Sequence, residues 1–226
     1  MEQAKRGVLP EHRSNHWIDK TKEREEMQIN FLFIGKLHIK KSRLRRQDWM
    51  NKKMKSIGYI LLSAGIAIFL YILLHEFGHM VVMLSAGATI TSFSIFTAHV
   101  SAVGGDYTNL SNMCMNANGA LFPLIISYFY SLLYKKGSTK SFYRIFSYVF
   151  ILIPIGSMLA WVFVPFLYLN GSAPINDDVT KFLIVFCENY HPLIVSVMAV
   201  VLMGLGVVLM IKKRIIHNFI EEIKQK

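Results

Sequence analysis

The chain has 226 residues, of which 53% are hydrophobic and only 17% are charged. With a mean hydropathy of +0.38, this composition is too apolar for an ordinary soluble domain and favours a membrane protein. The formal net charge is +11. Two kinds of partner could bind such basic segments, nucleic acid and anionic lipid.

Residues 1–55 form a basic arm that we expect to lie outside the bilayer. They hold fifteen of the 25 Lys and Arg residues together with seven acids, and their one apolar run, 29–39, is too short to span a membrane. Such an arm could contact nucleic-acid phosphates. Attraction to the lipid headgroups of the cytoplasmic face accounts for the same charges without a further partner, so we predict the lipid bilayer and no nucleic acid.

Four apolar runs are long enough to cross a bilayer core of roughly 30 Å as helices. The first is interrupted only by His75, Glu76 and His79. The third contains Pro154 and Pro165, which are expected to kink it and which a membrane helix tolerates when neighbours satisfy the freed carbonyls. The four expected spans are 56–85, 113–134, 145–169 and 192–211.

Basic residues near the ends of these spans predict the topology. The arm, the connection between the second and third spans, and the tail are all basic, whereas the loops 86–112 and 170–191 contain Lys181 alone. Both termini are therefore expected on the cytoplasmic side. This divides the chain into a cytoplasmic arm (1–55), a membrane core (56–211) and a cytoplasmic tail (212–226).

The first span carries the pattern His-Glu-x-x-His at residues 75–79. Residues four apart share one face of a helix, so His75 and His79 can bind one cation while Glu76 addresses its bound water. Catalytic zinc takes three protein ligands and a water whose pKa it lowers towards about 7, and Glu76 can accept the proton as general base. A chance match on an ordinary helix is the alternative, but ionisable groups within a span cost roughly 2.5 to 3.5 kcal/mol each and are usually functional.

A third ligand should come from the noncytoplasmic half of the membrane, because His75 follows Ser56 by 19 residues, or roughly 28 Å of helix. Asp177 and Asp178 follow Asn176 and precede an apolar run, as residues at a helix start do. Either can cap the helix or bind the metal, and the two roles can be split between them. The candidates on this side are Asp106, Asp177, Asp178, Glu188, His99 and His191.

The segment 89–107 lies between the first and second expected spans. In it, Phe93, Ile95, Thr97 and His99 alternate with Ser92, Ser94, Phe96 and Ala98, and this period of two residues predicts a strand or hairpin beside the site. A free strand edge there could pair with a locally unwound substrate and present an extended peptide bond to the metal. A covered loop is an equally good interpretation of the same residues.

The metal helix with its following apolar run, and the distant aspartate, resemble the site-2 protease family of intramembrane zinc metalloproteases. In that family the aspartate often follows an asparagine by eight residues, with a proline between them. Here Asn170 precedes Asp178 by eight residues, Pro174 lies between them, and Val179 stands where the family has glycine. The family also has a comparable β element after its metal helix.

The resemblance implies a zinc site made by His75, His79 and Asp178, with Asp177 as the alternative third ligand. It also makes Asn170 a candidate donor to the oxyanion that forms at the scissile carbonyl, although Asn170-Gly-Ser is also good turn chemistry.

The expected fold is thus an all-α polytopic membrane protein with about four transmembrane helices and a small β element after the metal-binding helix. The expected function is that of a zinc metalloendopeptidase that hydrolyses a peptide bond of a membrane-associated protein or peptide. Two alternatives stay open at this point: a zinc-dependent membrane hydrolase of a lipid or small amide, and a non-catalytic metal-binding membrane regulator. The motif does not separate them, because zinc polarises any carbonyl.

Overall fold

The computed structural model describes residues 14–224. They form six helices, with a two-stranded sheet between the first and the second, so the expectation of a mostly α-helical chain with a small β element is confirmed. The chain divides into two compact units, Met1–Lys52 and Lys53–Lys226. The elements are α1 (Ser14–Ser85), β1 (Thr89–Ser94), β2 (His99–Val103), α2 (Asn109–Leu133), α3 (Ser141–Leu169), α4 (Asp178–Phe186), α5 (Leu193–Lys212) and α6 (Ile215–Lys224).

Three of the described helices are long and apolar enough to cross a membrane: Lys40–Ser85 within α1, Ser141–Leu169 and Leu193–Lys212. Length and composition are thus compatible with a multi-pass membrane protein. The expected second span, 113–134, corresponds to α2 and its C-cap residue but is not among the three. Asparagines and serines lower the hydropathy of α2, and several of them, Asn116, Ser127 and Ser131, are buried within the protein.

The first unit contains the described part of the basic arm up to Lys52. From Ser14 the arm is helical and belongs to the same continuous helix, α1, that later carries the metal motif. The sequence predicted a basic arm without assigning it a secondary structure. Its side chains from Lys40 to Lys52 are exposed.

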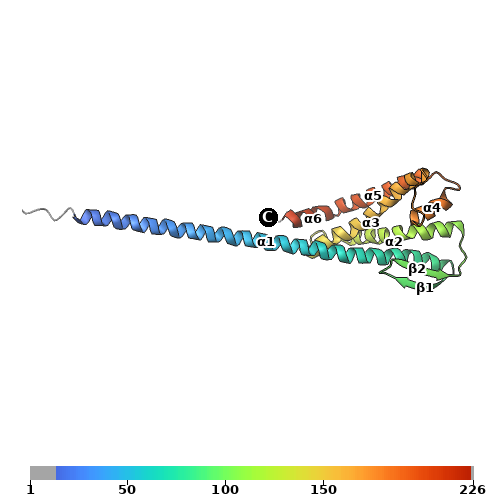
Figure 1. Ribbon diagram of the computed structural model, residues 1–226, viewed down its shortest axis with the longest axis horizontal. Helices are drawn as coiled ribbons and strands as arrows, with labels where there is room; N and C mark the ends of the chain where they lie inside the picture. Colours follow the sequence, from blue (N-terminus) through green and yellow to red (C-terminus); the bar gives the residue numbers. More distant parts are fainter. Residues whose placement is uncertain (1–13, 225–226) are drawn as a thin grey trace, which may run out of the picture. The chain divides into compact units, whose positions relative to one another are not determined.

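In the second unit, α3 is the central helix and contacts α2, α4, α5 and α6 (Figure 1). The helix continues through Pro154 and Pro165, both of which are buried. The Ser196 hydroxyl of α5 donates to the Val162 carbonyl of α3 over 2.8 Å. On its outer side α5 exposes large apolar side chains, as a helix facing lipid does. These include Val197, Met198, Val200 and Val201.

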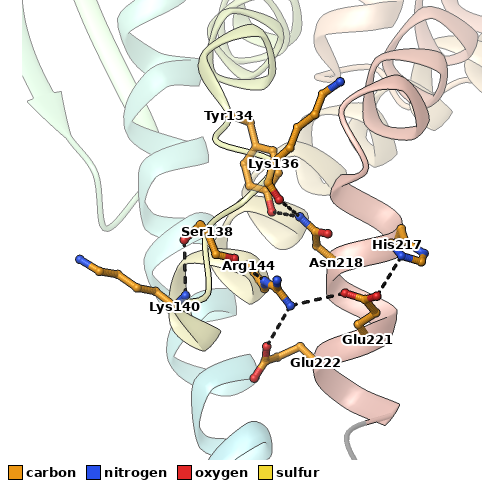
Figure 2. A network of polar contacts seen from close by, with 9 residues as sticks. All are labelled: Tyr134, Lys136, Ser138, Lys140, Arg144, His217, Asn218, Glu221 and Glu222. Atoms are coloured by element: carbon orange, nitrogen blue, oxygen red, sulfur yellow. Dashed lines mark hydrogen bonds and ion pairs between the residues drawn. The ribbon is translucent and has the colours of Figure 1, made fainter.

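The C-terminal helix α6 packs against α3 through a polar network (Figure 2). The Arg144 guanidinium of α3 lies 3.6 Å from the Glu221 carboxylate and 3.7 Å from that of Glu222. The Asn218 amide donates to the Tyr134 hydroxyl over 2.9 Å. Glu222 is only 6% exposed, and its pairing with Arg144 satisfies the requirement that a buried carboxylate have a cationic or hydrogen-bonding partner. The network fixes α6 to the end of the unit where α2 ends and α3 begins.

The expected hairpin is present and follows α1 directly. Strands β1 and β2 are antiparallel, with Thr89 opposite Val103 and Ser94 opposite His99. At the turn Ala98 has a φ of 45°, and the preceding Phe96 is 99% exposed. Beyond β2, the Asp106 backbone N–H donates to the Ala86 carbonyl over 2.8 Å and returns the chain to the end of α1.

Candidate metal centre

Three side chains from two distant segments meet at one point. The His75 and His79 Nε2 atoms are 3.1 Å apart. The Asp178 Oδ2 atom lies 3.2 Å from the first and 3.3 Å from the second. Among the described residues these three form a group that could hold a metal ion. It joins the metal motif of α1 to the first residue of α4.

The α-helix places the two imidazoles together because residues four apart lie one above the other on the same face. Their ring centroids are 4.7 Å apart, with the planes at 79°. The His79 Nδ1 atom lies 2.7 Å from the Met115 carbonyl of α2. A proton on Nδ1 satisfies this contact, which leaves the Nε2 lone pair free to bind a cation. The His75 Nδ1 atom is buried and has no such partner in the described chain.

The two adjacent aspartates have different roles at the start of α4. Asp177 is the N-cap, and its carboxylate accepts a hydrogen bond of 3.1 Å from the Val179 N–H. Asp178 is the first helical residue and faces the histidines. Burial alone would raise the pKa of the Asp178 carboxyl, but the His75 and His79 imidazoles, when they are protonated on Nε2 and no metal is bound, outweigh it and hold this pKa well below its usual range. The roles of capping the helix and facing the histidines are therefore split.

This split gives a prediction for Asp177→Ala. Loss of an N-cap carboxylate should lower the free energy of unfolding by about 1 kcal/mol, while the group of His75, His79 and Asp178 stays intact. Thermal unfolding in detergent measures the first effect and metal content per chain measures the second. A variant that keeps its stability but loses its metal would reverse the assignment of the two aspartates.

Glu76 lies next to His75 on α1 and is only 4% exposed. It makes no ion pair among the residues described. A buried carboxylate without a cationic partner is costly unless it serves a function. Its place in the His-Glu-x-x-His pattern, together with its burial, makes it the candidate general base.

Glycines allow α2 to pass close to the metal face of α1. A Cβ atom placed on Gly119 would lie 2.6 Å from the His79 Nε2 atom and 2.7 Å from the His75 Cε1 atom. A Cβ on Gly78 of α1 would lie 2.2 Å from the Asn118 carbonyl oxygen. Both distances are too short for real atoms, so only glycine fits at either position. The small residues of α2 thus have the close-packing role that helix contacts within a membrane favour.

We predict that Gly119→Ala weakens metal binding by more than about tenfold, because the new methyl group would displace both imidazole rings. Gly156→Ala in α3 is the matched control, since a Cβ there meets nothing within 4 Å. Competition with a chromophoric zinc chelator measures both affinities. Equal affinities in the two variants would show that the imidazoles do not need this space.

The other candidates from the sequence lie outside the metal group. Asn170 ends α3 as its C-cap and is exposed. The Asn109 amide donates to Glu188, while the His99 ring hydrogen-bonds the Ser101 hydroxyl and His191 accepts from the Leu193 N–H. Asp106 is exposed in the loop before α2.

Two contributors to the site were not identified from the sequence. Tyr71 lies one helical turn before His75, with ring centroids 5.9 Å apart. The spacing of four residues from His75 is a signal that could have found it. The Met115 carbonyl carries no such signal, because a backbone acceptor does not depend on the side chain.

No protein-family model matches the chain, and no curated protein or solved structure matches it either. The geometry therefore supplies the description of the site: a group able to bind a metal ion, with two histidines and the buried Glu76 on a helix long and apolar enough to cross a membrane and an aspartate from α4.

Proposed function

We propose that this chain is an intramembrane zinc metalloprotease, similar to the site-2 proteases, that hydrolyses a peptide bond of a membrane-associated protein or peptide. The observation that carries the proposal is the convergence within 3.3 Å of His75 and His79, on a candidate membrane helix, with Asp178 at the start of α4. Glu76, buried next to this group, completes the set of residues that the reaction needs.

The donor set supports zinc as the metal. Tetrahedral zinc with bonds of about 2.0 to 2.2 Å to nitrogen and oxygen places neighbouring ligand atoms about 3.3 to 3.6 Å apart. The three distances of 3.1, 3.2 and 3.3 Å are close to this spacing. Three protein ligands also leave the fourth position open, as in catalytic rather than structural sites. When bound there, zinc would lower the pKa of a water molecule and polarise a carbonyl.

The chain's own residues would then move the protons. Glu76 accepts a proton as the nucleophile forms and later delivers it to the leaving amine. The Met115 carbonyl holds the His79 ring in the orientation that points Nε2 at the cation. Asn170 is proposed to donate a hydrogen bond to the oxyanion. This last role rests on its spacing of eight residues from Asp178.

The substrate must be unwound at the bond that is cut, because a helix hides its peptide groups in its own hydrogen bonds. The β1–β2 hairpin supports this requirement. Its sheet has two strands only, so each strand has one edge without a partner strand in the described chain. Such an edge can pair with an extended segment of substrate.

The proposed topology has four spans with both termini on the cytoplasmic side. The 25 residues of α2 extend for about 37 Å, which exceeds the apolar core of the bilayer. Its polar residues Asn116, Ser127 and Ser131 are buried against the protein, where they do not meet lipid. These features support a crossing by α2 despite its lower hydropathy.

A cysteine-labelling experiment tests this topology. Asp106, Thr139 and Asn189 are exposed residues in three different connections, and each is changed to cysteine in a chain lacking Cys114 and Cys187. With four spans, a membrane-impermeant maleimide should label the Asp106→Cys and Asn189→Cys variants from outside the cell. Thr139→Cys should react only after permeabilisation. Labelling of Asp106→Cys and Thr139→Cys from the same side would show that α2 does not cross.

Proteolysis itself is tested by comparing the membrane proteins of cells that produce wild type with those that produce Glu76→Gln. Uncut precursors should accumulate in the variant alone. Purified protein incubated with tethered peptides and with lipid amides separates a protease from a lipid or amide hydrolase. Cleavage of lipid amides only would reject the proteolytic function.

A further inference from the structure

A second candidate binding site lies at the far end of α4 from the metal group. The end of α3 and the connection between α4 and α5 line an open cavity of about 630 Å³. Glu188 is the one carboxylate in its wall. The aromatic rings of Tyr168, Tyr190 and His191 line the cavity with it.

The Glu188 carboxylate accepts a hydrogen bond from an uncharged partner in this cavity. The Asn109 amide of α2 donates to it over 3.2 Å, which holds the carboxylate in place without neutralising it. No cation pairs with Glu188 among residues 14–224. The Tyr190 ring is supported by Phe186, with centroids 5.0 Å apart. A carboxylate beside aromatic rings suits a cation, because the ring faces attract positive charge.

The charge of the surrounding connections favours the same ligand. The segments 86–108 and 170–192 adjoin the metal group and the cavity and carry four carboxylates and a single lysine. The chain as a whole has a net charge of +11. Its basic residues therefore lie elsewhere, and this end of the unit attracts positively charged segments.

The length of α4 sets the distance between the metal group and the cavity. Helical hydrogen bonds continue past its last residue, since the Cys187 N–H donates to the Leu183 carbonyl and the Glu188 N–H to the Val185 carbonyl. Ten residues separate Asp178 from Glu188, or about 15 Å of helix. An extended peptide covers this distance in four or five residues at about 3.3 Å each.

We propose that the cavity around Glu188 binds a lysine or arginine side chain of the substrate, four or five residues from the bond that is cut. This inference rests on the proposed proteolytic function for its substrate, but the cavity can be tested without turnover. The site would then select substrates that carry a basic residue in the segment lying along α4, on the side away from the metal group.

Photolabelling of the Glu76→Gln protein tests the cavity directly. Three otherwise identical ten-residue peptides carry a photoreactive leucine analogue next to lysine, norleucine or glutamate. The lysine peptide should label residues 186–192 about three- to tenfold more than the norleucine peptide, as expected for one ion pair with aromatic contacts. Adding Glu188→Gln should remove this preference, whereas adding Asp106→Asn, an exposed carboxylate outside the cavity, should retain it. Equal labelling by lysine and norleucine, or a preference that survives Glu188→Gln, would overturn the proposal.

A cleavage experiment tests the distance. Membrane-tethered reporters with a randomised segment are cut by wild type, and the products are sequenced. Basic residues should be enriched four or five positions from the cut bond, and Glu188→Lys should replace them with acidic residues. Cleavage without this enrichment would reject the inference and leave the protease intact. If wild type and Glu76→Gln both leave every reporter uncut, the proposed function fails, while the photolabelling still decides what the cavity binds.

Discussion

Replacing Glu76 by glutamine should abolish turnover and leave the bound metal in place. Glutamine has nearly the same shape as glutamate but cannot accept the proton, and loss of a general base lowers rates by about 10²- to 10⁴-fold. Glu76 is not one of the three converging donors, so the metal content should stay at the wild-type level. The cleavage rate of a tethered peptide and the metal content per chain provide the two measurements.

The matched control for this variant is Glu221→Gln, which changes an exposed carboxylate of α6 in the network of Figure 2. It should cut at the wild-type rate, because α6 lies at the opposite end of the unit from the metal group. Wild-type activity in Glu76→Gln would remove the proposed base. Loss of metal in this variant would instead make Glu76 a ligand.

The second large effect is expected for Asp178→Ala, which should lower the metal affinity by at least about 100-fold. Removing one of three ligands is more severe than removing a supporting contact, which alone costs about 10- to 100-fold. The remaining imidazoles of His75 and His79 lie on a single helix and cannot enclose a cation. Metal content after dialysis against a weak chelator measures the loss.

Asp177→Ala is the control for this effect, because it removes the neighbouring carboxylate that caps α4. It should keep its metal. If Asp178→Ala retains wild-type metal content while Asp177→Ala loses it, the metal ligand is the other aspartate. If both retain it, the third ligand lies elsewhere in the chain.

The sequence was most informative where structure is local. Two histidines four residues apart must share a face of any helix, so the pairing of His75 with His79 followed from spacing alone. The helix start at Asp177 and Asp178 was also visible in the residue types. The residue types at Asp177 and Asp178 could not decide which aspartate faces the histidines. That depends on how α4 packs against α1, and about a hundred residues of chain separate the two segments.

Other features were beyond the reach of the sequence for identifiable reasons. The close approach of α2 at Gly119 could be anticipated as small-residue packing, but its contact with the imidazoles could not, since it depends on the register between two helices. The carbonyl that orients His79 belongs to the backbone of Met115. The four expected spans were counted from runs without charged residues, and this criterion included α2. A criterion based on hydropathy leaves α2 out, because α2 carries asparagines and serines, several of which are buried within the protein.

The alternative of a non-catalytic metal protein makes a distinct structural demand. A structural zinc site is closed by four protein ligands. The described chain brings three His, Asp or Glu side chains together at this point, which leaves a position for water and substrate. Glu76, which follows His75 in the chain and is buried, is not among the three converging side chains.

Zinc-edge X-ray absorption of the purified wild-type protein tests the central claim most directly. The account predicts a single shell of nitrogen and oxygen ligands at about 2.0 to 2.2 Å, with the outer-shell scattering of two imidazoles. In the His79→Ala variant, the outer-shell scattering should fall to that of one imidazole, which would assign this signal to the two histidines. A sulfur ligand at about 2.3 Å, or a spectrum without imidazole scattering, would contradict a site built from His75, His79 and Asp178.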